Sequence, residues 1–171
     1  MPHYDEFFSA PAKITIKSDY VNYSQYKDLE SNEWYKDGVA YCLDWDLIGG
    51  RTESVYGAND LITRSEVITA LHKATGETVA DITDNPNAPV TRQQLGTMIY
   101  RAAVAAEPEI AGPWALPLPV EDAAEIESWA DEAMHYCYTE GLITESNGLI
   151  NPNATVTKAQ AAVVLERFLN K

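Results

Sequence analysis

Apolar residues recur with helical spacing in several stretches of the chain. The clearest stretch holds Ile126, Trp129, Ala130, Ala133, Met134 and Cys137. Intervals of three and four residues place these side chains on one stripe, so the pattern predicts an α-helix with a single buried face. A similar stripe starts at Trp34 and runs through Tyr41 and Cys42, with Gly38 as a weak helix former within it.

Three more helices are predicted by a shared capping signal. Thr63, Thr91 and Thr157 are each followed, three residues later, by Glu66, Gln94 and Gln160 respectively. In such a capping box the Thr hydroxyl accepts from the third amide, and the Glu or Gln side chain accepts from the amide of the Thr. An apolar stripe follows each box, so a buried helix is expected after each Thr.

The chain also repeats itself. The segments that begin at Trp34 and Trp129 share Trp, Tyr, Cys, Leu and Ile at one constant offset of 95 residues. The three boxes are unevenly spaced, however, since Thr91 lies 28 residues after Thr63 and 66 residues before Thr157. The middle unit therefore has no room for a first helix.

These spacings divide the sequence into four parts. We expect an N-terminal extension at 1–25, a first unit at 26–76, a truncated middle unit at 77–106 and a third unit at 107–171, all in one compact domain. Gly49-Gly50 and Gly141 are expected to end the first helices in left-handed backbone. Residues 104–120 are interpreted as a surface connector and 12–17 as a short strand.

The matching positions in the two units also predict where the cysteines and aromatic residues lie. Cys42 and Cys137 are expected to be buried as small apolar residues. Trp34 and Trp129 are expected in the core, with a partly exposed face that stacks on sugar as the alternative. The spacing of Tyr20, Tyr23 and Tyr26 fits a helical edge that packs on the repeats.

Composition excludes several classes of function. Twelve basic against 26 acidic residues give a net charge of −14, which disfavours nucleic acids and anionic membranes. His3, His72 and His135 belong to no metal-binding or nucleophile motif, and the acidic residues form no calcium loop. Asp37, Asp44 and Asp46 are interpreted as a solvated helix face. We therefore expect no enzyme activity, no catalytic or metal site and no cofactor.

Taken together, these residues resemble the S-layer homology family. The third unit carries Asp122, Trp129-Ala130, Gly141-Leu142-Ile143, Asn151-Pro152 and Val156-Thr157-Lys158-Ala159-Gln160. The first unit carries Asp28, Trp34, Ala40, Leu47-Ile48-Gly49 and Ile62-Thr63-Arg64-Ser65-Glu66. The middle unit matches only in its second half. The resemblance implies a mainly α fold, a pseudo-threefold cluster of helix–loop–helix repeats with little or no strand.

The resemblance also implies a function. Members of this family attach exported proteins to the secondary cell-wall polysaccharides of Gram-positive bacteria, polymers that are acidic and often pyruvylated. The implied contacts are the basic residue after each Thr, the Thr residues themselves and the two Trp residues, namely Arg64, Arg92, Lys158, Thr63, Thr91, Thr157, Trp34 and Trp129. We expect an extracellular location at the cell wall, with a signal peptide outside this sequence and a cargo domain linked to the module in a longer parent protein.

A physical argument supports the basic residues. A cation at the first helical position opposes the helix dipole at a cost of roughly 0.3–1 kcal/mol. Free N-terminal amides, the dipole and the cation would together attract a carboxylate, which would offset that cost. Two alternatives stay open for each residue: pairing with a carboxylate of a neighbouring unit, or plain surface exposure. For the whole chain the alternative is a degenerate module that serves as a protein-interaction or spacer domain without binding glycan.

Overall fold

The computed structural model describes residues 23–79, 85–114 and 116–171. Its α-helices are α1 (Lys36–Asp44), α2 (Arg64–Thr75), α3 (Arg92–Ala106), α4 (Asp131–Thr139) and α5 (Lys158–Leu169). Short 3-10 turns are η2 (Tyr23–Gln25), η3 (Pro108–Ile110), η4 (Ala123–Glu125) and η5 (Ser128–Ala130). The predicted mainly helical fold is confirmed, because these residues contain isolated bridges but no strand. The strand expected at 12–17 and Tyr20 lie outside the described residues.

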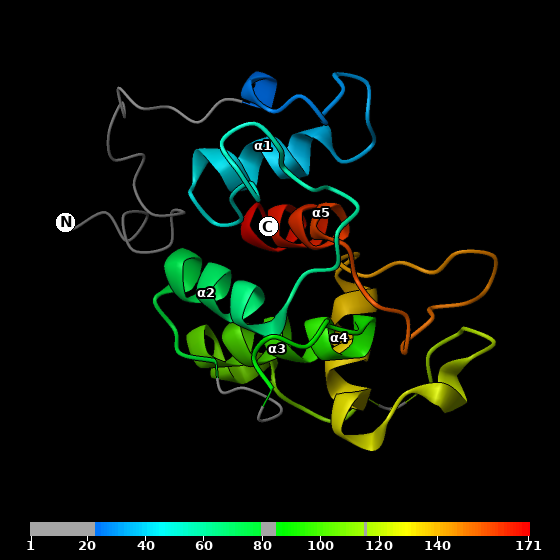
Figure 1. Ribbon diagram of the computed structural model, residues 1–171. Helices are drawn as coiled ribbons and strands as arrows, with labels where there is room; N and C mark the ends of the chain where they lie inside the picture. The colour runs from blue at the N-terminus through cyan, green and yellow to red at the C-terminus, as the bar shows by residue number, and fades with distance from the viewer. Residues whose placement is uncertain (1–22, 80–84, 115) are drawn as a thin grey trace.

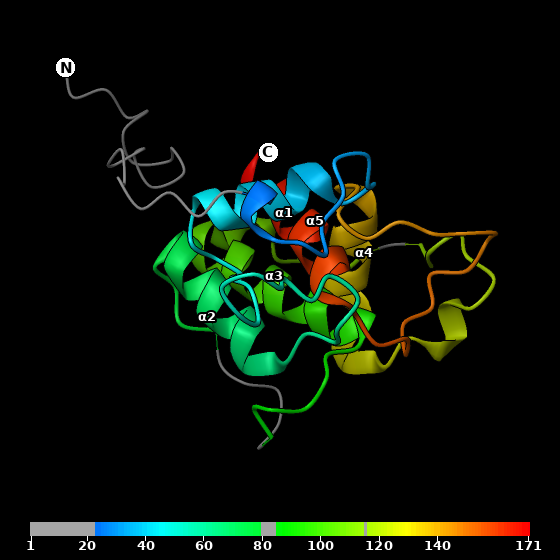
Figure 2. The same cartoon turned by 45° about the horizontal axis from the view of Figure 1, so that its top comes forward.

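Helices from distant parts of the chain pack in pairs. α1 packs along α5, α4 packs along α3, and α2 contacts α3. Figures 1 and 2 show α1 lying beside the C-terminal α5, while α2 and α3 form a neighbouring pair. Each first helix therefore packs on the second helix of another unit. The same sulfur contact recurs at both junctions, since Cys42 faces the Ala162 carbonyl and Cys137 faces the Gly96 carbonyl.

The Thr-capped helices meet at a ring of backbone hydrogen bonds. The Ile62 amide donates to Val156 (3.0 Å), the Val156 amide to Val90 (2.9 Å), and the Val90 amide to Ile62 (3.2 Å). All three side chains are buried. Because each residue directly precedes a capping Thr, this closed cycle sets the starts of α2, α3 and α5 around one common axis.

The predicted helix starts need correction. α1 begins at Lys36 and α4 at Asp131, so both Trp residues lie before their helices. Trp34 is 65% exposed and Trp129 is 45% exposed, and the expectation that they belong to the core is therefore wrong. Both cysteines, in contrast, are fully buried as predicted. Burial raises the pKa of each thiol to about 12.

Two glycine positions behave differently from the sequence-based prediction. Gly141 has the expected positive φ of 69° after α4, but after α1 the left-handed residue is Asp46 (φ 55°), not Gly49 or Gly50. Gly38 serves close packing instead. A Cβ there would lie 2.7 Å from the Cα of Val163 in α5, so the absence of a side chain lets the two helices approach.

The remaining predictions are partly met. α3 continues to Ala106, so the expected connector begins three residues later than 104, and Leu118 within it is buried. Tyr26 is buried and packs edge-on against Tyr56, while Tyr23 starts the turn η2. Among the described residues, no helix is long and apolar enough to cross a membrane.

Candidate functional site at the junctions between units

Each Thr-capped helix begins at a junction between two units. Thr63, Thr91 and Thr157 form complete capping boxes with Glu66, Gln94 and Gln160, as the sequence predicts. The Thr hydroxyls therefore already accept from the third amide of their own helices. In α2, hydrogen bonds from the Thr63 amide and from Arg51 hold the pKa of Glu66 below its usual value, although burial alone would raise it.

The first two amides of each helix are also occupied. The Arg64 and Ser65 amides donate to Ala88 and Pro86 at the start of α2. Equivalent bonds join α3 to the carbonyls of Ala154 and Pro152, and α5 to those of Asp60 and Ala58. The expectation of free N-terminal amides is therefore wrong, because a loop of another unit satisfies them. What remains for a ligand at these helix ends is the basic side chain.

Lys158 is buried between α5 and the loop of residues 49–56. Its side chain has no exposed surface, and its Nζ donates to the carbonyls of Gly49 (2.7 Å) and Tyr56 (2.5 Å). The ammonium also lies 4.2 Å from the centre of the Tyr56 ring. Burial, with the nearby cation of Arg51, lowers the pKa of Lys158 to about 8. Lys158 thus joins α5 to the loop of the first unit.

Arg92 makes the same connection at the next junction. Its Nε donates to Ile150 (2.7 Å) and its Nη2 to Thr144 (2.7 Å). Tyr56 and Ile150 occupy matching places in the first and third units, 94 residues apart. Arg92 is half-buried, and burial lowers its pKa while Asp122 opposes that effect. We call Lys158 and Arg92, each with its two carbonyl acceptors, the cation latches.

Arg64 holds the same helical position but has no latch. Its side chain is 6% exposed, and its fully buried Nε has no hydrogen-bond partner. Neither a hydrogen bond nor an ion pair joins its guanidinium to any residue in the described part of the chain. Arg64 therefore differs from Lys158 and Arg92, although all three hold the same position after a capping Thr.

An aspartate supports each latch from the other side. Asp28 accepts from the amides of Tyr56 and Gly57, both at 2.8 Å. Asp122 accepts in the same way from Ile150 (2.9 Å) and Asn151 (2.7 Å). The aspartate therefore accepts from backbone amides of the same loop whose backbone carbonyl accepts from the cation. The sequence analysis noted both aspartates but gave them no role. Their matching position, 28 residues before Tyr56 and before Ile150, could have indicated a shared contact.

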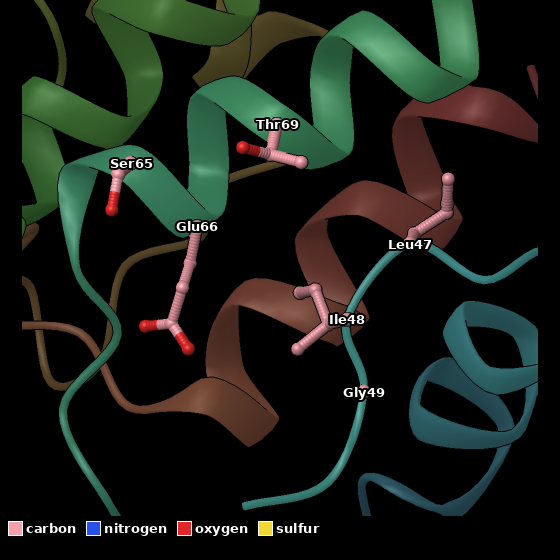
Figure 3. Close-up of a pocket in the computed structure, with 6 residues that line it drawn as sticks. All are labelled: Leu47, Ile48, Gly49, Ser65, Glu66 and Thr69. Carbon is pink, nitrogen blue, oxygen red and sulfur yellow. The ribbon is translucent and has the colours of Figure 1, made fainter.

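A shallow groove lies beside the start of α2. It has a volume of about 180 Å³ and is lined by Leu47, Ile48, Gly49, Ser65, Glu66 and Thr69. Figure 3 shows the Ser65, Glu66 and Thr69 side chains projecting from α2 opposite the 47–49 segment. Leu47, Ile48 and Gly49 form one wall of the groove. On the other wall the Glu66 carboxylate already accepts from Arg51 and Thr63.

Comparison with known families settles what kind of module this is. The model of the S-layer homology domain matches residues 25–68 and 121–162, together just over half of the chain. The chain belongs to the S-layer homology family. Its S-layer homology regions contain α1 with the start of α2, and α4 with the start of α5. No curated protein matches the chain.

One solved structure supports the fold. The undecaheme cytochrome from the S-layer of Carboxydothermus ferrireducens matches with a TM-score of 0.53 and 16% identity, over 71% of this chain. The match spans only 19% of that cytochrome. At this identity the likeness shows the fold alone. S-layer homology domains as a family are non-catalytic modules that bind cell-wall polymers, so the family points to cell-surface anchoring in general.

Proposed function

We propose that this chain anchors a secreted protein to the wall of a Gram-positive bacterium by binding an acidic secondary cell-wall polysaccharide. The observation that carries the proposal is the exposure of Trp34 and Trp129 at matching places in the two S-layer homology regions. An indole that remains exposed after folding offers a flat apolar face with a polar edge, which suits stacking on a sugar ring. A linked cargo domain in a longer parent protein belongs to the same proposal.

The division into three units is part of this proposal. The closed cycle of hydrogen bonds at Ile62, Val90 and Val156 supports three equivalent second helices. The family match leaves residues 69–120 uncovered, which agrees with a middle unit at 77–106 that lacks its first helix. Units at 26–76 and 107–171 supply the complete helix pairs.

Among the proposed contacts, the structure favours some over others. Trp34, Trp129 and Arg64 have surfaces or donors to offer a polymer, whereas Lys158 has none and Arg92 already donates to two carbonyls. The hydroxyl-lined groove beside α2 would accept an uncharged sugar of the same polymer. The alternative is a spacer or interaction module without glycan affinity. It is supported by Lys158 and Arg92, whose donors already bind backbone carbonyls.

Co-sedimentation with purified Gram-positive wall sacculi tests the proposal. The chain should pellet with sacculi that carry the secondary polysaccharide and stay soluble after the polymer is removed with hydrofluoric acid. The Trp34→Ala/Trp129→Ala double variant should pellet at least tenfold less, and Trp45→Ala, directly after α1, serves as the aromatic control. Equal pelleting with stripped and intact sacculi, or no pelleting with either, would favour the spacer module.

A further inference from the structure

His135 of α4 has backbone carbonyl oxygens at both of its ring nitrogens. Its Nδ1 lies 2.9 Å from the oxygen of Asp131, one turn earlier in the same helix. Its Nε2 lies 2.7 Å from the oxygen of Leu116, which belongs to the connector that follows α3. His135 is only 7% exposed, so water has little access to either contact. The imidazole therefore joins the connector to α4.

The two carbonyl acceptors bear on the number of protons that the ring carries. A carbonyl oxygen can only accept, whereas a neutral imidazole has one N–H and one lone pair. A neutral ring would therefore place a lone pair against a carbonyl oxygen at 2.7 or 2.9 Å. An imidazolium donates from both nitrogens and satisfies both contacts. Burial opposes the charge, but hydrogen bonds from a charged donor are roughly twice as strong as neutral ones. The geometry favours the protonated ring.

The nearest groups also suit a cation. The Asp131 carboxylate lies 3.6 Å from Nδ1 of His135. The indole of Trp114, in the connector, stacks on the imidazole with 5.8 Å between ring centres and 16° between ring planes. A cation within about 6 Å of an indole centre is attracted to the face of the ring. The connector adds no charge of its own here, because no titratable residue occurs between Ile110 and Val120.

The titratable groups of the other elements around α4 have partners of their own. Tyr100 of α3 donates to Glu132 of α4 (3.0 Å), and Lys171 after α5 forms an ion pair with Glu140 just after α4. The turn η5 contains only Ser, Trp and Ala. Neither of the two pairs includes His135, so the acid that faces its ring is Asp131.

We infer that His135 is a proton-dependent clasp, in which the protonated ring holds the connector on α4 and loss of one ring proton releases it. The released proton is the one on Nε2, since Nδ1–H keeps its acceptor within α4. Imidazole is the side chain that ordinarily changes charge between about pH 5 and 8, so the clasp responds to pH near neutrality. Trp114 (38% exposed) and Leu116 (77% exposed) are then presented on a fixed segment at low pH and on a free one at higher pH. This inference goes beyond anchoring and does not depend on it.

NMR of the ring nitrogens in the intact chain tests the clasp. The ¹⁵N signals of His135, assigned with His135→Gln, should show protons on both nitrogens at about pH 5.5. The indole Nε1–H signal of Trp114, assigned with Trp114→Phe, should change together with them as the pH rises. Both changes should occur at a higher pH than those of the exposed His72 in the same sample. A Trp114 signal that does not follow His135 would overturn the clasp, and so would a His135 ring that loses its proton no later than His72.

Thermal unfolding between about pH 5.5 and 7.5 provides the second arm. The folded chain binds the extra proton, so the stabilisation by His135 should be full at low pH and decline as the pH rises. The difference in thermal midpoint between the wild type and His135→Gln should therefore shrink with pH. His72→Gln, the matched control on α2, should keep the pH dependence of the wild type. A difference for His135→Gln that stays constant or grows would contradict the clasp. If His135→Gln does not fold, the wild-type NMR titration decides alone.

Discussion

Replacing Lys158 and Arg64 in turn with Met compares a buried cation that has two carbonyl acceptors with one whose Nε has none. Met has a similar length and keeps the apolar stem in place, so each substitution mainly removes a charged head group. In Lys158→Met, the carbonyls of Gly49 and Tyr56 lose their donor at 2.7 and 2.5 Å. In Arg64→Met, the Nε that is lost had no acceptor.

The magnitudes follow from these contacts. A hydrogen bond to a charged group contributes about 1.5–3 kcal/mol, and a buried acceptor left unpaired costs about 1–3 kcal/mol. Removing the buried ammonium returns part of this through relieved desolvation. We therefore expect Lys158→Met to lower the free energy of unfolding by about 2–4 kcal/mol. Arg64→Met should not lower it and should raise it by about 1–4 kcal/mol, because no hydrogen bond of the Nε is lost and an unpaired buried charge is removed.

Urea unfolding followed by far-UV circular dichroism measures both changes. The midpoint shift multiplied by a common m-value gives each difference, and an unchanged m-value shows that the unfolded state is not altered. Arg92→Met extends the series and should resemble Lys158→Met. A loss for Arg64→Met as large as that for Lys158→Met would show that Arg64 has internal acceptors, which would refute the reasoning. A neutral Lys158→Met would refute the latch itself.

Three other perturbations test separate parts of the structure. The pKa of Lys158 is about 8 in the folded chain against an ordinary value of 10.5, so between pH 8 and 9.5 the unfolded chain binds more protons. Stability should therefore rise with pH by at most about 1.4 kcal/mol per unit from this residue, and the rise should be missing in Lys158→Met when urea midpoints are compared. Gly38→Ala should lower the free energy of unfolding by about 1–3 kcal/mol, because the new Cβ would lie 2.7 Å from the Val163 backbone. This clash outweighs the gain of about 1 kcal/mol in helix propensity. A thermal midpoint equal to or above that of the wild type would contradict this packing. Trp34→Ala should change stability by less than about 1 kcal/mol, since the side chain is 65% exposed, and thermal unfolding of this variant checks the assignment.

Local signals predicted the second helices well. The capping boxes at Thr63, Thr91 and Thr157 depend on residues three apart, so the sequence alone contains the whole motif. The burial of Cys42 and Cys137 was also predictable, because both lie on the apolar stripes and match at a constant offset. The family resemblance adds the mainly helical fold, but the packing of α1 on α5 and of α4 on α3 was not predicted.

The Trp residues show where periodicity fails. Trp129 matches the stripe of Met134 and Cys137 by spacing, but the backbone before Asp131 forms a 3-10 turn, and the 3.6-residue period does not continue through it. A stripe does not reveal where its helix begins unless a cap marks the start. Neither Tyr35 nor Ala130 caps its helix with a side chain, so this signal was missing.

The cation latches could not be predicted, because their acceptors are backbone carbonyls. Lys158 and Gly49 are 109 residues apart, and a carbonyl oxygen is present at every position, so no residue type marks the acceptor. Charge reasoning instead treated the three cations as equal and directed them toward an external anion. The acceptors that distinguish them come from packing between distant segments, which no single segment contains.

α2 differs from α3 and α5 on the face by which those two helices pack against α4 and α1. Gly96 on α3 and Ala162 on α5 each face a first helix, and the matching residue on α2 is Ile68. Near it, Thr69 and His72 are exposed, whereas the counterpart of His72 on α3 is the buried Tyr100, which donates to Glu132 of α4. This face of α2 is therefore partly polar, and Thr69 and His72 can contact solvent without a covering helix.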